Sequence, residues 1–196
     1  MSSFFRLALP LVMAGLVVPV ALQAAPGSLK IGDKPENFTL SAPDGKQHSL
    51  FLKEAPKATT VLFISARCPI SNRYNGRMIE FAQQYGQKGV RFLALNANDP
   101  ETMEDIDEHA KRIGYRFPVL RDVKNVVADK WGAQVTPEAF VLDQQGVLQY
   151  HGRIDDQLAE RKVTSPDLKN ALEAVLAGKK PEKPETKATG CDIKRI

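Results

Sequence analysis

Residues 59–71 read Thr-Thr-Val-Leu-Phe-Ile-Ser-Ala-Arg-Cys-Pro-Ile-Ser, and they decide the fold. The first six of them are β-branched or apolar, which is typical of a strand buried on both faces of a sheet. Apolar residues then recur at helical spacing from Tyr74 to Tyr85. The stretch therefore predicts a buried strand that runs directly into a helix, with Cys68 at the start of that helix.

Strand and helix patterns alternate on both sides of this stretch. Strands are expected at residues 37–40, 47–51, 90–96, 117–120, 139–142 and 147–151, and helices at residues 101–113, 125–131 and 165–176. The helix at 101 has an acidic first turn, and the helix at 165 has Ser165 as its expected N-cap and Pro166 at its first position. This alternation, which closes with a hairpin and a helix, predicts an α/β sandwich with a mixed sheet.

The N-terminal segment has the pattern of a secretory signal peptide. Arg6 is followed by an apolar run at residues 7–20 and by small residues at 21–25. The run is short for a membrane helix and contains two prolines, so an uncleaved anchor is the less favoured alternative. We therefore expect residues 1–24 to be a cleaved signal. The mature chain is then periplasmic or secreted and has no stable membrane span.

Composition and charge limit the classes of function. Of the 196 residues, 43% are hydrophobic and 26% are charged, which is typical of one globular domain with appendages. The net charge of +4 comes without a basic block, so nucleic acid is not an expected partner. The three histidines, His48, His109 and His151, have no ligand spacing with a cysteine, so no metal or other cofactor is predicted.

The chain contains two cysteines, Cys68 and Cys191. In an oxidising compartment they can form one intramolecular bridge. Residues 179–190 are mainly Lys, Pro, Glu and Thr, so we expect residues 179–196 to form a flexible tail that carries Cys191 back to a domain spanning residues 25–178. The sequence leaves open whether the bridge is a structural staple or a redox-active pair.

Two segments, residues 68–71 and 135–137, together resemble the thioredoxin-like superfamily. They read Cys-Pro-Ile-Ser at the predicted helix start and Val-Thr-Pro just before a predicted strand. With Gly-Arg-Ile-Asp-Asp at residues 152–156 and Gly-Cys at residues 190–191, the likeness is greatest to exported redoxin-domain proteins of the AhpC/TSA and TlpA-like branch. It covers about residues 30–178.

The resemblance implies a thioredoxin-like three-layer sandwich with a central mixed β-sheet flanked by helices. It implies that Cys68 is the redox nucleophile, activated by the helix start. It also implies that the peptide between Thr136 and Pro137 is cis and faces Cys68, beside backbone that can pair with an incoming chain. Cys191 would then resolve a mixed disulfide or a sulfenate on Cys68. The implied partners are protein thiols or disulfides, or a peroxide.

Several polar side chains are candidates for tuning Cys68. Arg67, Arg73 or Arg77 would lower the pKa of the thiol if its guanidinium faced the sulfur. Arg153 would stabilise an anion near the sulfur or form an ordinary pair with an aspartate. Ser71 can donate a hydrogen bond to a thiolate, or it is a plain first-turn residue.

Two departures from the family patterns bear on the reaction. Ser71 replaces the second cysteine of the thioredoxin motif, so a mixed disulfide has no neighbouring thiol to release it. Val61 replaces the proline of the peroxiredoxin motif Pro-x-x-x-Thr/Ser-x-x-Cys, although Ser65 supplies its hydroxyl. We therefore expect a thiol–disulfide oxidoreductase. The alternatives are a thiol peroxidase, a copper-handling or protein-binding module, and a non-catalytic domain with a structural disulfide.

Overall fold

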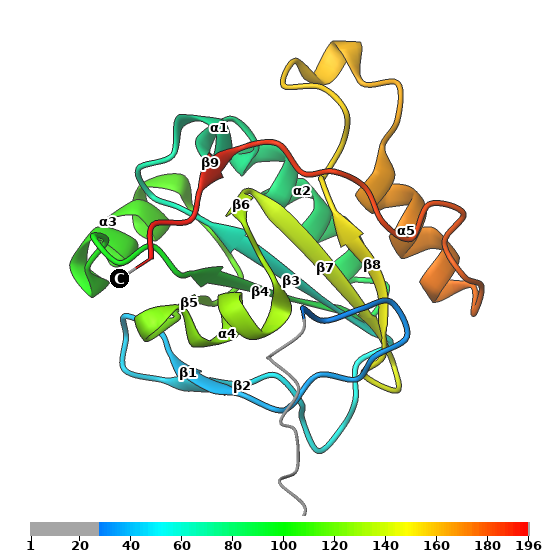
Figure 1. Ribbon diagram of the computed structural model, residues 1–196, viewed down its shortest axis with the longest axis horizontal. Helices are drawn as coiled ribbons and strands as arrows, with labels where there is room; N and C mark the ends of the chain where they lie inside the picture. The colour runs from blue at the N-terminus through cyan, green and yellow to red at the C-terminus, as the bar shows by residue number, and fades with distance from the viewer. Residues whose placement is uncertain (1–27, 196) are drawn as a thin grey trace, which may run out of the picture.

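The computed structural model describes residues 28–195, and a five-stranded sheet runs through its centre (Figure 1). The strands follow the order β5-β4-β3-β7-β8 across the sheet. They are β3 (Ala58–Ile64), β4 (Val90–Asn96), β5 (Val119–Arg121), β7 (Glu138–Asp143) and β8 (Leu148–Gly152). β3, β4 and β5 are parallel, whereas β7 runs antiparallel to β3 and to β8. The sheet is therefore mixed, as the sequence predicts.

β3 is the central strand, and its position places Cys68. All seven residues of β3 are buried, because β4 and β7 flank it and both faces of the sheet are covered. β3 ends at Ile64, and four residues later Cys68 begins the first helix. The predicted strand-to-helix junction is thus present, and Cys68 lies at the end of the most buried strand.

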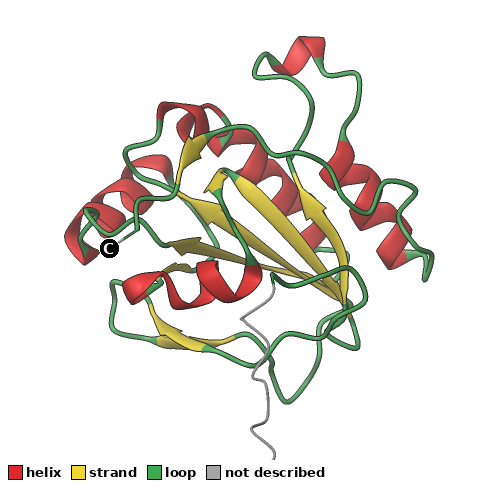
Figure 2. Cartoon of the chain, in the orientation of Figure 1, coloured by secondary structure: helices red, strands yellow, loops and turns green. Residues whose placement is uncertain are grey.

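Helices and a hairpin cover the two faces of the sheet (Figure 2). One face carries α1 (Pro69–Arg73), α2 (Asn75–Gly86), α3 (Met103–Ile113) and α5 (Asp167–Leu176). The other carries α4 (Val126–Trp131) and the hairpin of β1 (Thr39–Ser41) and β2 (Gln47–Ser49). Each face has its own apolar core, one around Met78 and Ile106 and the other around Trp131 and Phe140. The domain therefore has three layers.

The start of α3 differs from its predicted position. α3 begins at Met103 and not at residue 101, because Thr102 caps the helix. The Thr102 hydroxyl accepts a hydrogen bond from the Asp105 N–H, and the Asp105 carboxylate accepts one from the Thr102 N–H. Glu101, which was expected in the first helical turn, precedes the cap and is buried.

α5 also begins later than its predicted position. Pro166, and not Ser165, holds the N-cap position, and the helix starts at Asp167. The Ser165 hydroxyl donates to the Asp167 carboxylate, whose other oxygen pairs with Arg153. A bond between two side chains thus takes the place of the expected cap on the backbone.

The first part of the C-terminal tail lies along the edge of the sheet. The N–H of His151 in β8 donates to the carbonyl of Pro184 at 2.9 Å, and the Thr186 N–H donates to the carbonyl of His151 at 3.0 Å. The exposed edge of β8 is therefore partly covered by the chain's own tail.

The last part of the tail forms a strand of its own. β9 (Cys191–Asp192) pairs antiparallel with β6 (Val135–Thr136), the segment just before β7. Ile193 follows and is 4% exposed, because it packs into the core on the α4 face. The composition predicts a flexible tail; in the structure, backbone hydrogen bonds, side-chain bonds such as that of Arg195 with Asp129, and the apolar anchor hold the tail on the domain.

The predicted signal peptide, residues 1–24, lies outside the described residues. Within residues 28–195 no helix is long and apolar enough to cross a membrane.

The core on the α4 face can be tested at Phe140. This residue is fully buried, and its ring packs against the rings of Phe63, Trp131 and His151. Phe140→Ala leaves a cavity, so we expect it to lower the free energy of unfolding by about 3–5 kcal/mol in urea titrations. Leu52→Ala is the matched control, because that side chain is 48% exposed, and it should change the value by less than about 0.5 kcal/mol. Equal effects of the two substitutions would contradict this core.

Candidate functional site

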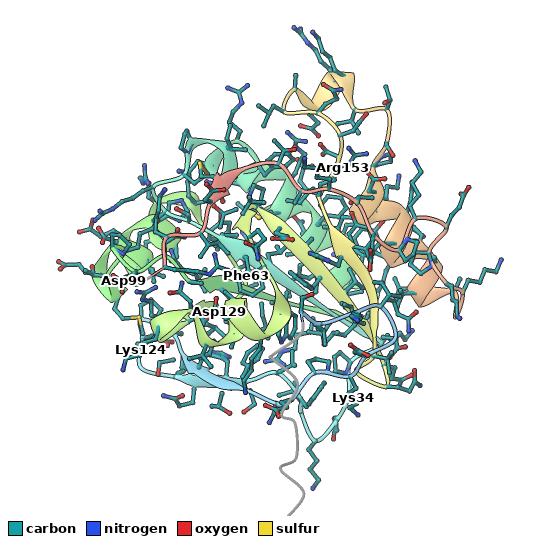
Figure 3. The ribbon with its side chains drawn as sticks, viewed as in Figure 1. Lys34, Phe63, Asp99, Lys124, Asp129 and Arg153 are labelled. Atoms are coloured by element: carbon teal, nitrogen blue, oxygen red, sulfur yellow. A yellow bond between two sulfur atoms is a disulfide. The ribbon has the colours of Figure 1, made fainter. Side chains whose placement is uncertain are left out.

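The two cysteines form a disulfide near the place where the tail passes α1 (Figure 3). The Cα atoms of Cys68 and Cys191 lie 5.9 Å apart, which is within the usual range for a disulfide. Cys68 is 4% exposed, and Cys191 is half-buried. The tail therefore closes over the sulfur of Cys68 and supplies the second sulfur.

Cys68 holds the N-cap position of α1, as the strand-to-helix pattern predicts. The main-chain N–H of Ser71 donates to Cys68 Sγ at 3.3 Å. An N–H group directed at the sulfur favours the thiolate once the bridge is reduced. The Ser71 hydroxyl has another partner, because it accepts a hydrogen bond from the Ser65 N–H at 3.4 Å. Ser71 thus contacts the sulfur through its main chain.

A buried carboxylate, Glu101, holds the loop that leads to Cys68. It accepts hydrogen bonds from the Ser65 hydroxyl and from the Ala66 N–H, the second at 2.7 Å. Ser65 Oγ in turn accepts a hydrogen bond from the Cys68 N–H at 2.9 Å. The Asn96 amide donates to the same carboxylate at 2.6 Å. Sequence reasoning missed this role, because an acid near a helix start is an ordinary first-turn pattern.

Asn72 ties this loop to α3. Its side-chain amide donates to the Ala66 carbonyl at 2.9 Å, and its side-chain oxygen lies 2.6 Å from His109 Nε2. Burial lowers the pKa of His109, so the imidazole is neutral at pH 7 and donates to Asn72 from Nε2. Throughout residues 28–195, no group of three or more His, Cys, Asp or Glu side chains is arranged to hold a metal ion.

The peptide between Thr136 and Pro137 is cis, as the resemblance implies. The Thr136 carbonyl oxygen lies 3.3 Å from Cys68 Sγ. In the register of β6 and β9, Thr136 pairs directly with Cys191. The structure therefore brings Cys68, Cys191 and this cis peptide together. Cys191 lies in an extended segment that pairs with the backbone beside the cis peptide, which we call the extended-chain position.

A second buried carboxylate, Glu138, holds the loop before the cis peptide. It accepts hydrogen bonds from the N–H groups of Gln134 at 2.8 Å and Val135 at 3.2 Å. Its other oxygen pairs with Nε2 of His151, whose ring stacks on Phe140 with 4.3 Å between centroids. The signal that could have found Glu138 is an acid at the start of an otherwise apolar strand, because a buried acid requires partners.

Three of the four candidate arginines are paired with carboxylates, and the fourth, Arg73, is exposed at the end of α1. The pairs are Arg67 with Asp105 at 2.9 Å, Arg77 with the buried Asp155, and Arg153 with Asp167 at 2.7 Å. Among the described residues, no hydrogen bond joins an arginine side chain to the sulfur of Cys68. The guanidinium of Arg67 thus pairs with the first turn of α3. The hydrogen bond to the sulfur comes from the main-chain N–H of Ser71.

A groove of about 380 Å³ opens beside the disulfide. Its lining is mixed, and the tail contributes Thr189. The apolar side chains include Ile70, Tyr74, Pro137 and Leu158, and the charged ones are Arg153, Asp155, Asp156 and Lys162. Burial and the charge of Asp155 raise the pKa of Tyr74, so its phenol stays protonated and donates to that carboxylate. A second cavity, of about 440 Å³, lies between residues 29–38 and α4 and shares no lining residue with this groove.

Residues 31–151 match the profile of the AhpC/TSA family. The chain belongs to the AhpC/TSA family. Its predicted thioredoxin-like fold is confirmed by solved structures, of which a candidate thiol:disulfide interchange protein, DsbE, of Chlorobium tepidum is one example. That structure superimposes with a TM-score of 0.60 at 21% identity, over 77% of this chain and 98% of its own.

Two further proteins are similar to this AhpC/TSA family member over most of its length. A hypothetical protein of Sinorhizobium meliloti is 35% identical, with a TM-score of 0.79 over 87% of this chain and 97% of its own. The thiol-disulfide oxidoreductase ResA of Geobacillus thermodenitrificans is 25% identical over 148 residues, which are 76% of this chain and 79% of the relative.

The role of Glu101 can be tested by Glu101→Gln. A side-chain NH₂ cannot accept the hydrogen bonds that a carboxylate oxygen accepts from Ser65 or Ala66. We expect a loss of about 1–3 kcal/mol in the free energy of unfolding, and faster hydrogen exchange at the amides of Ala66 and Cys68. Glu104→Gln, at an exposed position of α3, is the control and should leave both unchanged. Wild-type exchange rates at these two amides in the Glu101→Gln chain would contradict the role.

Proposed function

We propose that this AhpC/TSA family member is a thiol–disulfide oxidoreductase that uses Cys68 as nucleophile and Cys191 as resolving thiol. The observation that carries the proposal is the bridge between a buried N-cap cysteine and a cysteine seated in the extended-chain position beside Thr136. The similarity to a protein named thiol-disulfide oxidoreductase ResA supports the same reaction class.

The reaction proceeds by two thiol–disulfide exchanges. The thiolate of Cys68 attacks a disulfide of a partner protein, so that the partner's S–S bond breaks and one of its sulfurs leaves as a thiolate. Cys191 then attacks the sulfur of Cys68 and releases the second partner thiolate. The partner disulfide has been reduced to two thiols, and the pair Cys68–Cys191 has been oxidised by the same two electrons. A dithiol reductant returns the chain to its reduced form.

In this proposal the other site residues bind and orient. Thr136 offers its backbone to the extended segment of the partner, and Pro137 lines the groove beside it. Ser71 stabilises the thiolate through its N–H. Arg67 contributes positive charge at the rim, reduced by its pairing with Asp105.

Disulfide exchange fits the site better than turnover of peroxide. A peroxidase of this superfamily uses a proline, a hydroxyl, the cysteine and an arginine to hold the peroxide. Here Val61 takes the place of the proline, and the Ser65 hydroxyl donates to Glu101. Three of the four candidate arginines are engaged with Asp105, Asp155 and Asp167, and Arg73 is exposed. The peroxidase reading remains the second candidate, because Ser65 and Cys68 keep the motif's spacing.

We also propose that the chain works outside the cytoplasm, in the periplasm or as a secreted protein. The support is the signal-peptide pattern of residues 1–24 and the pairing of the two cysteines, since disulfides persist in oxidising compartments.

The reactivity of Cys68 can be tested by its pKa. In a Cys191→Ser chain we expect the rate of alkylation by iodoacetamide to rise with a midpoint below about 8.5, because the Ser71 N–H and the start of α1 favour the thiolate. The same chain in urea is the control and should return to the ordinary value. A folded-state midpoint at or above that value would refute the reactive thiol. A midpoint that rises on Arg67→Gln would assign the effect to the arginine.

The exchange reaction can be tested by trapping. Without Cys191 no nearby thiol can release a partner from Cys68, so Cys191→Ser should accumulate mixed disulfides with a disulfide-containing protein. Non-reducing electrophoresis and mass spectrometry detect them, and Cys191→Ser combined with Cys68→Ser is the control.

Treatment of the same Cys191→Ser chain with hydrogen peroxide separates the two candidate reactions. Rapid formation of a sulfenic acid on Cys68, without a trapped partner, would show that the chain is a peroxidase. A bridge that resists excess dithiol in the unmodified chain would show a structural staple.

A further inference from the structure

The C-terminal tail lies where the proposed function requires a partner chain to bind. β9 pairs with β6, and Cys191 lies opposite Thr136. In Figure 1 the tail runs across the molecule from α5 to β9, which lies beside α1, and ends near α3. A partner segment that pairs with Thr136 therefore meets a site that is already filled.

Two glycines let the tail approach the domain this closely. A Cβ on Gly190 would overlap the carbonyl oxygen of Thr136, and a Cβ on Gly152 would overlap the carbonyl oxygen of Thr186. Gly152 also has φ +148°, which other residues rarely adopt. Both neighbours are main-chain atoms, which cannot rotate out of the way. At both positions, therefore, the tail can lie this close to the domain only because glycine has no side chain.

An apolar residue anchors the tail after the cysteine. Ile193 is 4% exposed in the core that contains Trp131 and Ala133, and its N–H donates to the Gln134 carbonyl at 2.9 Å. The side chain two residues after the cysteine therefore binds in an apolar site. Asp192, which lies between Cys191 and Ile193, is exposed.

The groove beside the disulfide is only partly used by the tail. Thr189, two residues before the cysteine, is the tail's contribution to its lining. The rest of the groove, about 380 Å³ beside Ile70, Tyr74 and Leu158, has room for a larger side chain. A partner with such a side chain gains contacts there that the tail lacks.

We propose that residues 189–193 are an internal copy of the partner segment that this site recognises. The partner is a protein with a disulfide in an extended segment. Its cysteine has glycine directly before it, an apolar residue two positions after it, and a bulky apolar residue two positions before it. This inference rests on the proposed function. The partner segment enters by displacing β9, its sulfur takes the position of Cys191, and the returning tail later takes that position back.

Activated peptides test the pattern on the full-length Cys191→Ser chain. The parent peptide copies residues 187–194, with its cysteine in a disulfide with thionitrobenzoate. Matched peptides carry alanine for the glycine, serine for the isoleucine, or leucine for the threonine before the glycine. Attack by Cys68 on the peptide sulfur breaks this disulfide, leaves the peptide on Cys68 and releases the coloured thiolate. The release rate and the mass of the adduct are measured.

We expect the alanine and serine peptides to react about tenfold more slowly than the parent, and the leucine peptide to react faster than the parent. Gly190→Ala, added to Cys191→Ser, should speed the reaction with the parent peptide, because the tail can no longer pair with β6. Ile193→Ser, added separately, should do the same. The small reagent dithiobis(nitrobenzoate) is the control for the thiol itself.

The outcomes separate this inference from the function on which it rests. Equal rates for all four peptides, with a normal reaction of the small reagent, would overturn the inference and leave the oxidoreductase intact. Unchanged peptide rates in both tail variants would overturn the claim that the tail blocks the site. Failure of the peptides and of the small reagent to react with Cys68 would refute the proposed function itself.

Discussion

The backbone pairing of Cys191 with Thr136 is the contact on which the rest of the site depends. The carbonyl oxygen of Thr136 lies 3.3 Å from the sulfur of Cys68, so one residue touches both halves of the disulfide. Thr136 also begins the cis peptide to Pro137, and Glu138 accepts hydrogen bonds from the N–H groups of Gln134 and Val135 just before it. Because this segment is fixed, any chain that reaches Cys68 by pairing with it must be extended and must place its cysteine opposite Thr136.

Buried carboxylates hold the loops that meet at Cys68. Glu101, Glu138 and Asp155 are 3%, 4% and 6% exposed, so each requires partners that replace water. Glu101 and Glu138 accept backbone N–H groups of the loops before Cys68 and before the cis peptide. Asp155 pairs with Arg77, whose guanidinium also donates to two carbonyls of the loop beside the groove. The walls of the site are thus tied to buried charge, whereas the tail is held by the disulfide, by backbone bonds, by Ile193 and by the exposed pair of Arg195 with Asp129.

The local sequence pattern was sufficient to predict those parts of the structure that depend on residues close together in sequence. The buried run of β3 and the helix start at Cys68 followed from it, and the cis peptide at Thr136 followed from the family resemblance. Glu101 was placed in a helical turn, because an acid at that spacing looks the same whether it faces solvent or turns inward. The path of the tail depends on contacts such as that of Gly190 with Thr136, between residues far apart in sequence. No periodicity within the tail contains that information.

The place where the tail is anchored explains how it can both cover Cys68 and serve as its resolving thiol. The Thr186 N–H is bonded to His151, and residues 186–191 span at most about 17 Å even when fully extended. When the β6–β9 pairing opens and this anchor holds, Cys191 stays within that distance of Thr186. Its return is then intramolecular, at an effective concentration that is roughly millimolar for a short tether. The tether therefore makes Cys191 an efficient resolving thiol, and it also makes the tail compete continuously with a partner segment for pairing with Thr136. A dilute partner displaces it only with contacts that the tail lacks, and the groove beside Thr189 is where such contacts are available.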